Sequence, residues 1–328
     1  MSLQSLLKKI RQIVGYIIMQ YRESCYEIFD ISNFESEQFE QLGTKSKFWY
    51  VDDHQRQYLF KSIESKSGDR IGEDWAEKIS CELAECIGLP HAYYELAVHD
   101  GVRGVITQNF ISQKGEYLTS GNELLQEYLR ISTDENPNIQ YIKDVYEIMT
   151  QKIVGKPIGF DSFPNVKTAS EFFVGYLMFD ALISNQDRHN ENWGMIRTVR
   201  GATHLAPSYD HGASLARNES DAQRQTRLLS KDKGQQVASY VLKARSQFLD
   251  PSSNKKLKLL EVFYQYGMLE KKAARAWLTK LRFLDERCLR GLINKVPHTL
   301  MSDVSKEFTY QLIEHNKENL LKLNNEFL

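Results

Sequence analysis

The sequence has few cysteines, and their spacing excludes two common kinds of site. The 328 residues include four, Cys25, Cys81, Cys86 and Cys288, and no two of them form a Cys-x-x-Cys pair. No histidine lies beside them at zinc-site spacing, so we expect neither a zinc site nor a dithiol redox motif. Free thiols of this kind are typical of the reducing cytoplasm, which is the predicted location. Delivery to a host cell is the alternative that the sequence leaves open.

The chain also lacks a large net charge of either sign. Its 42 Lys and Arg residues are balanced by 43 Asp and Glu residues, which leaves a formal charge of −1. A chain of this composition has no overall attraction to nucleic acid or to an anionic membrane, so any basic patch must be local. Two short basic runs, at residues 255–258 and 271–275, are interpreted as solvated faces of helices. Direct binding of nucleic acid is therefore not expected.

No apolar run is long enough to cross a bilayer. The run IVGYIIM near the N-terminus is too short, and no small-residue cleavage site follows it. Across residues 1–24, apolar residues recur at helical spacing with Lys8, Lys9 and Arg11 on the opposite side. This pattern predicts an amphipathic helix, which we expect to pack on its own domain. The alternative is a helix that lies on a membrane surface or in the groove of a partner.

Residues 25–111 have the pattern of a small α+β lobe. Short segments rich in β-branched or aromatic residues predict strands at residues 26–31, 48–53, 57–63, 93–99 and 104–111. One helix interrupts them, over GEDWAEKISCELAECIGLP. Its first turn is acidic, which suits the helix dipole, and Gly88 and Pro90 mark its end.

Residues 112–328 are predicted to be mainly helical. Apolar residues at a spacing of three to four predict helices at residues 123–131, 142–149, 171–183, 255–266, 271–284, 286–296 and 306–323. The one non-helical segment that we expect is residues 192–210, where short strands around Gly201 predict a hairpin. The plan is thus a strand-rich lobe, a helical lobe and a hairpin near residues 185–212. Ligands of such proteins bind in the cleft between the lobes.

Dense polar residues flank this hairpin, in NQDRHNENWG (185–194) and APSYDHGAS (206–214). Phosphoryl transfer from ATP needs a carboxylate that orients the attacking hydroxyl, together with oxygen ligands for magnesium. The order Asp-x4-Asn, hairpin, Asp-x-Gly is the arrangement of kinase catalytic and metal-binding loops. We therefore predict that Asp187 is the catalytic base and that Asn192 and Asp210 bind Mg²⁺, with Asn192 also serving catalysis.

Two neighbours of Asp187 have alternative interpretations. His189 is a catalytic candidate that steadies the loop, assists proton transfer or stabilises charge on the transferred group. Arg188 pairs either with a structural acid such as Asp180 or with phosphate. The sequence leaves these alternatives open.

A kinase also needs a strand lysine that grips the phosphates and a helix glutamate that orients this lysine. The apolar strand Tyr58-Leu59-Phe60 ends in Lys61, ahead of the predicted helix. In that helix Glu77 shares a stripe with small residues, as close packing between lobes requires. Lys61 and Glu77 are therefore the predicted pair, with Glu73 and Glu82 as alternatives to Glu77.

The remaining nucleotide contacts are predicted from position in the chain. Residues 42–48 precede Lys61 and form the predicted phosphate-covering loop, in which Gly43, Ser46 and a lysine would cradle phosphate. The loop has one glycine and matches no Walker or G-x-G-x-x-G pattern, so a plain polar turn is the alternative. Gln108 and Phe110 end the last strand of the first lobe, where a hinge would meet adenine.

The two polar segments resemble the HipA-like serine/threonine kinase family. The family pattern N-x-D-R-H-x-x-N-W/F-G, followed by L/I-A-P-x-Y/F-D-x-G-S, matches residues 185–194 and, up to its glycine, residues 205–212. The resemblance implies a two-lobed protein-kinase-like fold of the α+β class. It also implies ATP- and Mg²⁺-dependent phosphorylation of protein serine or threonine, with autophosphorylation at Ser46 or Thr44. An antitoxin or other regulatory protein is an implied partner, and a bacterial toxin or effector role is an implied use.

Two other functions remain as alternatives. The segment DRHNEN also resembles the catalytic loop of phosphatidylinositol 3- and 4-kinases, which makes a lipid kinase the second hypothesis. The third is a pseudokinase that serves as a nucleotide-binding scaffold. Such proteins usually lack the base, a metal ligand or the lysine, whereas Asp187, Asp210 and Lys61 are all present here. Keeping buried charged groups without ions or phosphates beside them is costly, and this favours an active enzyme.

Overall fold

The computed structural model describes residues 25–35, 38–39, 45–65, 71–111, 113–129 and 139–328. The predicted N-terminal helix over residues 1–24 lies outside these ranges, as do Gly43 and Thr44. Within the described residues, no helix is both long enough and apolar enough to span a bilayer. We keep the predicted boundaries 25–111 and 112–328 as a working division of the chain.

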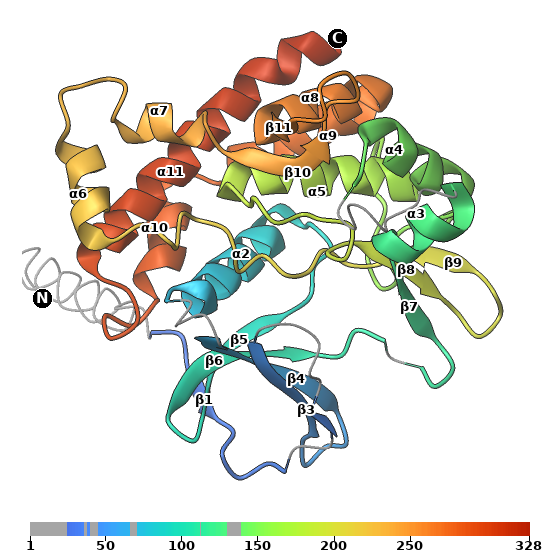
Figure 1. Ribbon diagram of the computed structural model, residues 1–328, viewed down its shortest axis with the longest axis horizontal. Helices are drawn as coiled ribbons and strands as arrows, with labels where there is room; N and C mark the ends of the chain where they lie inside the picture. The colour runs from blue at the N-terminus through green and yellow to red at the C-terminus, as the bar shows by residue number, and fades with distance from the viewer. Residues whose placement is uncertain (1–24, 36–37, 40–44, 66–70, 112, 130–138) are drawn as a thin grey trace, which may run out of the picture.

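A six-stranded sheet forms the first lobe, in the order β1-β5-β6-β4-β3-β2. Its strands are β1 (Ile28–Asp30), β2 (Gln38–Phe39), β3 (Lys45–Val51), β4 (Gln57–Ser65), β5 (Tyr94–His99) and β6 (Val102–Gln108). In Figure 1 the sheet lies at the bottom of the molecule, and helix α2 (Glu73–Ile87) lies between it and the helical lobe. The side chains of a strand alternate between two faces. Phe60 therefore packs with Phe48 and Tyr50 on one face, while Lys61 points to the other.

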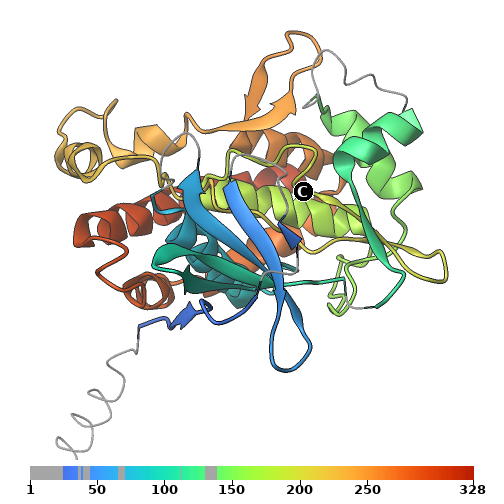
Figure 2. The ribbon, with the colours of Figure 1, turned by 60° about the horizontal axis from the view of Figure 1, so that its bottom comes forward.

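Helix α2 begins and ends at residues of left-handed backbone conformation. Gly72 precedes it with a φ of 89° and Gly88 follows it with a φ of 66°. Such conformations favour glycine. The helix is buried along most of its length, and Trp75, Ile79 and Leu83 join the main hydrophobic core of the protein. It is therefore fixed between the sheet and the second lobe, and Figure 2 shows the sheet in front of it.

Helices make up most of the second lobe. They are α3 (Gly121–Leu129), α4 (Ile142–Gln151), α5 (Ala169–Ile183), α6 (Asp221–Leu229), α7 (Val237–Val241), α8 (Leu259–Leu269), α9 (Lys271–Lys280), α10 (Glu286–Asn294) and α11 (Asp303–Lys322), with 3₁₀ turns η1 (Leu281–Phe283) and η2 (Leu323–Phe327). Helix α5 is almost wholly buried and packs against α8, α9 and α11. Its N-terminus is closed by a capping box of Thr168 and Glu171. The lobe is thus assembled around α5, and the C-terminal end of α5 leads into the polar segment at residue 185.

The predicted hairpin is present around Gly201, which has a φ of 80°. Strands β8 (Gly194–Arg197) and β9 (Thr203–Leu205) pair antiparallel, and β7 (Tyr117–Ser120) adds a third strand beside β8. The polar segments that precede β8 and follow β9 are brought together by this pairing.

The expectation that this hairpin is the only non-helical segment of the second lobe was wrong. Residues 245–249 and 256–258 form a second antiparallel pair, β10 (Arg245–Leu249) and β11 (Lys256–Lys258). The run 255–258 was interpreted as a helix face, but Leu257 is buried between exposed Lys256 and Lys258. That alternation has the period of a strand. The predicted helix begins only at Leu259. In the first lobe, Ser46 likewise lies in strand β3 rather than in a turn.

Candidate active site

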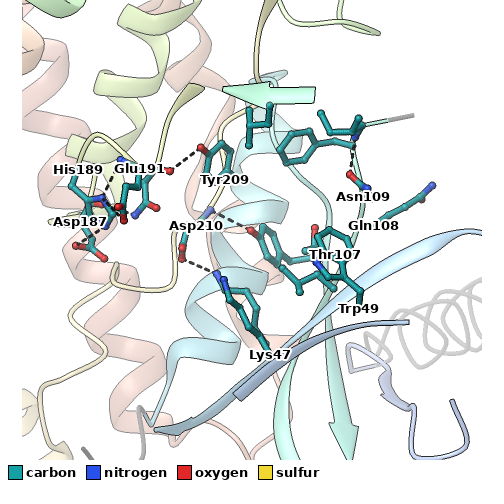
Figure 3. Close-up of a pocket in the computed structure, with 17 residues that line it drawn as sticks. Lys47, Trp49, Thr107, Gln108, Asn109, Asp187, His189, Glu191, Tyr209 and Asp210 are labelled. Atoms are coloured by element: carbon teal, nitrogen blue, oxygen red, sulfur yellow. Dashed lines mark hydrogen bonds and ion pairs between the residues drawn. The ribbon is translucent and has the colours of Figure 1, made fainter. Parts of the chain in front are cut away.

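A cavity of about 630 Å³ opens between the sheet and the polar segments around the hairpin. Figure 3 shows side chains from both lobes around it. Seven of the predicted site residues line this cavity: Lys61, Gln108, Phe110, Asp187, His189, Asn192 and Asp210. They come from sequence positions up to 149 residues apart, between Lys61 and Asp210. The fold thus brings most of the predicted site to one place.

Lys61 lies between two carboxylates at the inner end of the cavity. Its Nζ is 2.9 Å from Oδ1 of Asp210 and 3.6 Å from Oε1 of Glu77. Of the glutamates considered on α2, the structure places Glu77 beside this lysine. Glu73 packs against Gly212 instead, and Glu82 pairs with Lys78.

The charges of this cluster follow from burial and from mutual attraction. Burial alone lowers the pKa of Lys61, but the neighbouring carboxylates offset this, and its pKa lies well above the ordinary value. Burial raises the pKa of Glu77 to about 7, against the opposing effect of the Lys61 ammonium group. Lys61 is therefore a fixed positive charge, and Asp210 is its nearer counter-ion.

The backbone around Asp210 is in an unusual conformation. Asp210 has a φ of 58°, in the left-handed region that Asp tolerates better than most residues. Its N–H donates to the hydroxyl of Tyr94, and the N–H of His211 donates to Oε2 of Glu77. At Gly212 an added Cβ would lie 2.5 Å from Cγ of Glu73, so the Asp-His-Gly segment requires glycine there. These contacts turn the Asp210 carboxylate toward Lys61.

Asp187 lies in the loop between α5 and β8, and its side chain is 43% exposed. The loop is held by its own hydrogen bonds: His189 N–H donates to the Asp187 carbonyl, and Asn192 N–H donates to the His189 carbonyl. Nδ2 of Asn192 also donates to the Asp187 carbonyl, at 2.8 Å. Since this amide nitrogen is engaged, the oxygen is the atom of Asn192 that suits a cation. Nε2 of His189 is 3.9 Å from Oδ1 of Asp187.

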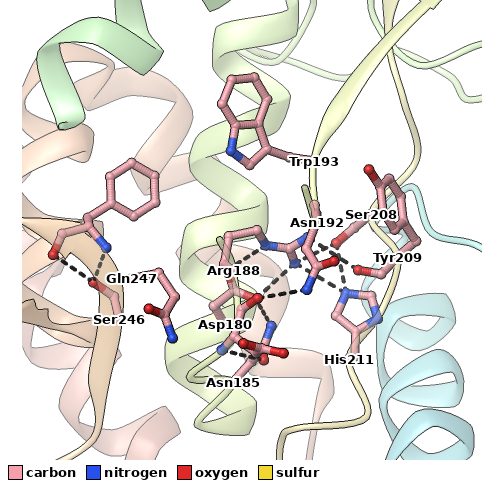
Figure 4. A network of polar contacts seen from close by, with 12 residues as sticks. Asp180, Asn185, Arg188, Asn192, Trp193, Ser208, Tyr209, His211, Ser246 and Gln247 are labelled. Atoms are coloured by element: carbon pink, nitrogen blue, oxygen red, sulfur yellow. Dashed lines mark hydrogen bonds and ion pairs between the residues drawn. The ribbon is translucent and has the colours of Figure 1, made fainter. Parts of the chain in front are cut away.

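Arg188 points away from the cavity into a buried network (Figure 4). Its guanidinium donates to both carboxylate oxygens of Asp180, at 2.8 Å each. It also donates to the carbonyls of Asn192 and Tyr209 and to the hydroxyl of Ser208. Arg188 thus pairs with a structural acid, Asp180, which is the first of the two alternatives that the sequence left open. The arginine fixes the loop of Asp187 against the segment of Asp210.

His211 completes this network as a neutral side chain. Burial lowers its pKa well below the ordinary value, and the nearby Arg188 charge adds to the effect. Because a guanidinium only donates hydrogen bonds, Nε2 of His211, 3.3 Å from Arg188, acts as the acceptor. The middle residue of the Asp-His-Gly segment therefore has a packing role inside the protein.

The far end of the cavity is aromatic. The rings of Phe110 and Tyr209 stack with centroids 5.7 Å apart, and the hydroxyl of Tyr209 donates to the Glu191 carbonyl. Gln108 is the last residue of β6 and also lines the cavity. The N–H of the intervening Asn109 already donates to the Gln57 carbonyl. This end suits a flat, apolar ring system.

Sequence reasoning missed several residues of the cavity. Tyr94, Thr107, Tyr209 and Trp49 all line it. The signal for Tyr94 was weak, because an aromatic residue in a strand predicts only that it packs. Tyr209 precedes Asp210 directly, so its proximity to that residue was a usable signal.

The polar groups fit a magnesium ion that a nucleotide brings with it. Among the described residues, no three His, Cys, Asp or Glu side chains form a cluster that could hold a metal alone. Magnesium is usually bound through one or two carboxylates together with substrate phosphates and water. Asp210 and Asn192 both line the cavity, and a carboxylate and an amide oxygen have the required chemistry.

The chain belongs to the HipA-like C-terminal domain family, whose model matches residues 40–281. It is 23% identical over 252 residues to the serine/threonine-protein kinase CtkA of Helicobacter pylori, covering 75% of this chain and 70% of that protein. The crystal structure of the H. pylori proinflammatory kinase CtkA matches 92% of this chain and 98% of its own, with a TM-score of 0.69 and 17% identity.

The HipA protein of Shewanella oneidensis, solved with HipB and operator DNA, matches 94% of this chain and 70% of its own, with a TM-score of 0.50 and 10% identity. These matches confirm the predicted family and the two-lobed kinase-like fold of the α+β class. They also confirm the predicted class of enzyme, a HipA-like kinase.

Proposed function

We propose that this protein transfers the γ-phosphoryl group of ATP to serine or threonine hydroxyls of proteins. The observation that carries the proposal is the convergence of Lys61, Asp187, Asn192 and Asp210 around one cavity, with the buried Glu77 beside Lys61. These are the groups that phosphoryl transfer requires. The serine/threonine specificity of the H. pylori relative supports the acceptor class.

Each residue has a separate role in the proposed reaction. Lys61 binds the phosphates of ATP, and Glu77 holds the lysine in place from the buried side. The stacked pair of Phe110 and Tyr209 borders the adenine end, with Gln108 beside it. Asp187 orients the acceptor hydroxyl and accepts its proton. Asp210 and Asn192 hold Mg²⁺, which neutralises charge on the phosphates when it is bound.

Three parts of the earlier interpretation stay predictions. His189 lines the cavity near Asp187, where steadying the loop, assisting proton transfer and stabilising charge on the transferred group all stay predictions. Autophosphorylation at Ser46 or Thr44 stays a prediction, and Ser46 lies in β3, directly before the cavity residue Lys47. The HipA structure contains HipB and operator DNA, and a corresponding regulatory partner of this chain remains a prediction.

The decisive experiment follows phosphate transfer with Asp187→Asn. Purified protein is incubated with labelled ATP and magnesium, together with protein, peptide or phosphatidylinositol acceptors, and the sites are mapped by mass spectrometry. We expect transfer to protein serine or threonine and a loss of about 10²–10⁴-fold in the variant. Asp161→Asn is the matched control, because Asp161 is exposed and does not line the cavity.

Three outcomes would contradict the proposal. Asp187→Asn at full activity would remove Asp187 from the reaction. Transfer only to the lipid would favour the lipid-kinase hypothesis. ATP binding without transfer to any acceptor would favour a pseudokinase.

A further inference from the structure

The second hairpin of the helical lobe carries a strong local charge. Residues 243–258, which we call the basic hairpin, comprise β10, β11, their connecting turn and the two residues before β10. They include five basic residues and one acidic residue, a net charge of +4 in a chain whose total is −1. All five basic residues are exposed: Lys243, Arg245, Lys255, Lys256 and Lys258. The charge is therefore directed toward solvent.

The alternation of the two strands decides which side chains face outward. On β10, Ser246 and Phe248 are buried, while Arg245 is exposed and Gln247 half-buried. On β11, Leu257 is buried between exposed Lys256 and Lys258. Arg245 and Lys258 are paired across the ladder, and the guanidinium of Arg245 donates to the Lys256 carbonyl. Arg245, Lys256 and Lys258 thus lie on one outward face of a folded ribbon.

This ribbon is attached directly to the loop that carries Asp187. Nε2 of Gln247 donates to the Gln186 carbonyl at 2.7 Å, and the N–H of Arg245 donates to Oε1 of Gln186 at 3.3 Å. Gln186 is the residue before Asp187, whose side chain is 43% exposed. An acceptor hydroxyl that reaches Asp187 therefore brings its neighbouring residues close to the basic hairpin.

A buried glutamine strengthens the attachment. The N–H of Leu249 in β10 donates to the Gln140 carbonyl, and Nε2 of Gln140 donates to the Arg188 carbonyl at 2.6 Å. Oε1 of Gln140 accepts from Nε1 of Trp193, the residue before β8. Gln140 is completely buried. The basic hairpin thus has a fixed position relative to the catalytic loop.

The loop itself would repel an acidic substrate. Asp187 and Glu191 are both exposed there, with side-chain exposures of 43% and 62%. Opposite charges on two surfaces guide their association and stabilise the complex. The positive charge beside this loop would therefore favour an acceptor hydroxyl whose neighbouring residues are negative.

We propose that the basic hairpin is a substrate-docking surface that selects serine or threonine residues flanked by acidic residues. The proposal rests on the kinase function proposed above and adds the class of acceptor sequence. Exposed ion pairs are weak, and each one changes binding by roughly two- to fivefold. Two or three such pairs give a preference of about tenfold for an acidic peptide over its neutral counterpart. The preference should decline with salt.

The test compares three peptides that share one central serine and differ only in flanking residues, which are Asp and Glu, Asn and Gln, or Lys. The full chain is assayed for kcat/KM at low and raised ionic strength. We expect the acidic peptide to be preferred about tenfold over the neutral one. In Lys256→Glu/Lys258→Glu this preference should vanish or reverse, with nucleotide affinity unchanged. Lys272→Glu/Arg275→Glu is the matched control, because these exposed residues of α9 bear the same charge outside the basic hairpin.

A second measurement separates the two proposals. Fluorescence anisotropy of the labelled acidic peptide reports docking without any phosphate transfer. If no peptide is phosphorylated but the acidic peptide still binds through Lys256 and Lys258, the kinase proposal fails and the docking surface stands. If transfer occurs with equal kcat/KM for all three peptides, or if the hairpin variant keeps the acidic preference, the docking surface is refuted. Tighter binding of a single-stranded oligonucleotide than of the acidic peptide would also refute it.

Discussion

The buried pair of Arg188 and Asp180 allows a quantitative test of how the catalytic loop is held. Their side chains are 1% and 2% exposed and are joined by two hydrogen bonds of 2.8 Å. Removing one partner from a buried pair leaves a charge without compensation, which costs about 3–5 kcal/mol. Domains are stable by about 5–15 kcal/mol. We therefore expect Arg188→Met to lose a large share of the free energy of unfolding.

A double variant separates charge burial from positioning. Asp180→Leu should be destabilised for the same reason as Arg188→Met, because it leaves the guanidinium buried alone. The pair Arg188→Met/Asp180→Leu buries no charge, and such replacements are often nearly neutral. We expect it to be more stable than either single variant. Phosphate transfer should nevertheless stay low, because the carbonyls of Asn192 and Tyr209 lose the donor that fixes the loop.

Urea unfolding followed by circular dichroism gives the three free energies, and phosphopeptide mass spectrometry gives the activity. Arg290→Met is the control: Arg290 pairs with Glu286 and Glu307, and its side chain is 39% exposed. Its loss should cost less than about 1 kcal/mol. The reasoning is refuted if Arg188→Met unfolds like the wild type. It is equally refuted if the free energy of unfolding of the double variant is lower than that of the wild type by the sum of the decreases in the two single variants.

Three further predictions concern other parts of the fold. In Gly175→Ala the added methyl group would lie 2.4 Å from the Trp277 ring, so we expect a loss of about 1–3 kcal/mol in urea unfolding, and an unchanged midpoint would contradict this packing. Burial lowers the pKa of His91 below 6.5, so the unfolded state binds its proton first as the pH falls. As the pH decreases from 6.5, the free energy of unfolding should decrease by at most about 1.4 kcal/mol per pH unit through this group. The decrease should be smaller in His91→Asn. Sγ of Cys86 and Sγ of Cys288 are 3.8 Å apart on α2 and α10, so oxidised glutathione should link them with release of two glutathione molecules. Mass spectrometry that finds only glutathione adducts would contradict this.

Local spacing accounts for the predicted site residues that the structure brings together. Asp187 and Asn192 lie in one loop, and the hairpin that follows brings back Asp210 after a connection set by Gly201. Each of these relations depends on turns and strands a few residues long. The same holds for Lys61, whose direction follows from strand alternation after Phe60. Such features are fixed by local chemistry and can be inferred without the rest of the chain.

Tertiary packing accounts for what the sequence did not reveal. Three glutamates on α2 were candidates, and only the packing of the helix on the sheet and on Gly212 distinguishes Glu77 from Glu73. The aromatic border of Tyr94 and Tyr209 depends on which face of each element meets the other lobe. In β11 the short run Lys256–Lys258 is too brief for periodicity to separate strand from helix. Its antiparallel pairing with β10 makes it a strand.

The loop of Asp187 is held in place by the protein itself, and this bears on how the proposed reaction is organised. The Arg188 side chain connects the loop to the segment of Asp210, and the Arg188 carbonyl accepts from Gln140, which supports the basic hairpin. One buried residue thus joins the proposed metal-binding side of the site to the proposed substrate side. Groups that are fixed before the substrates bind need no reorganisation during phosphoryl transfer, which is how enzymes gain most from electrostatic stabilisation. The many polar contacts around residue 188 are therefore what the proposed reaction requires of a loop that positions two substrates at once.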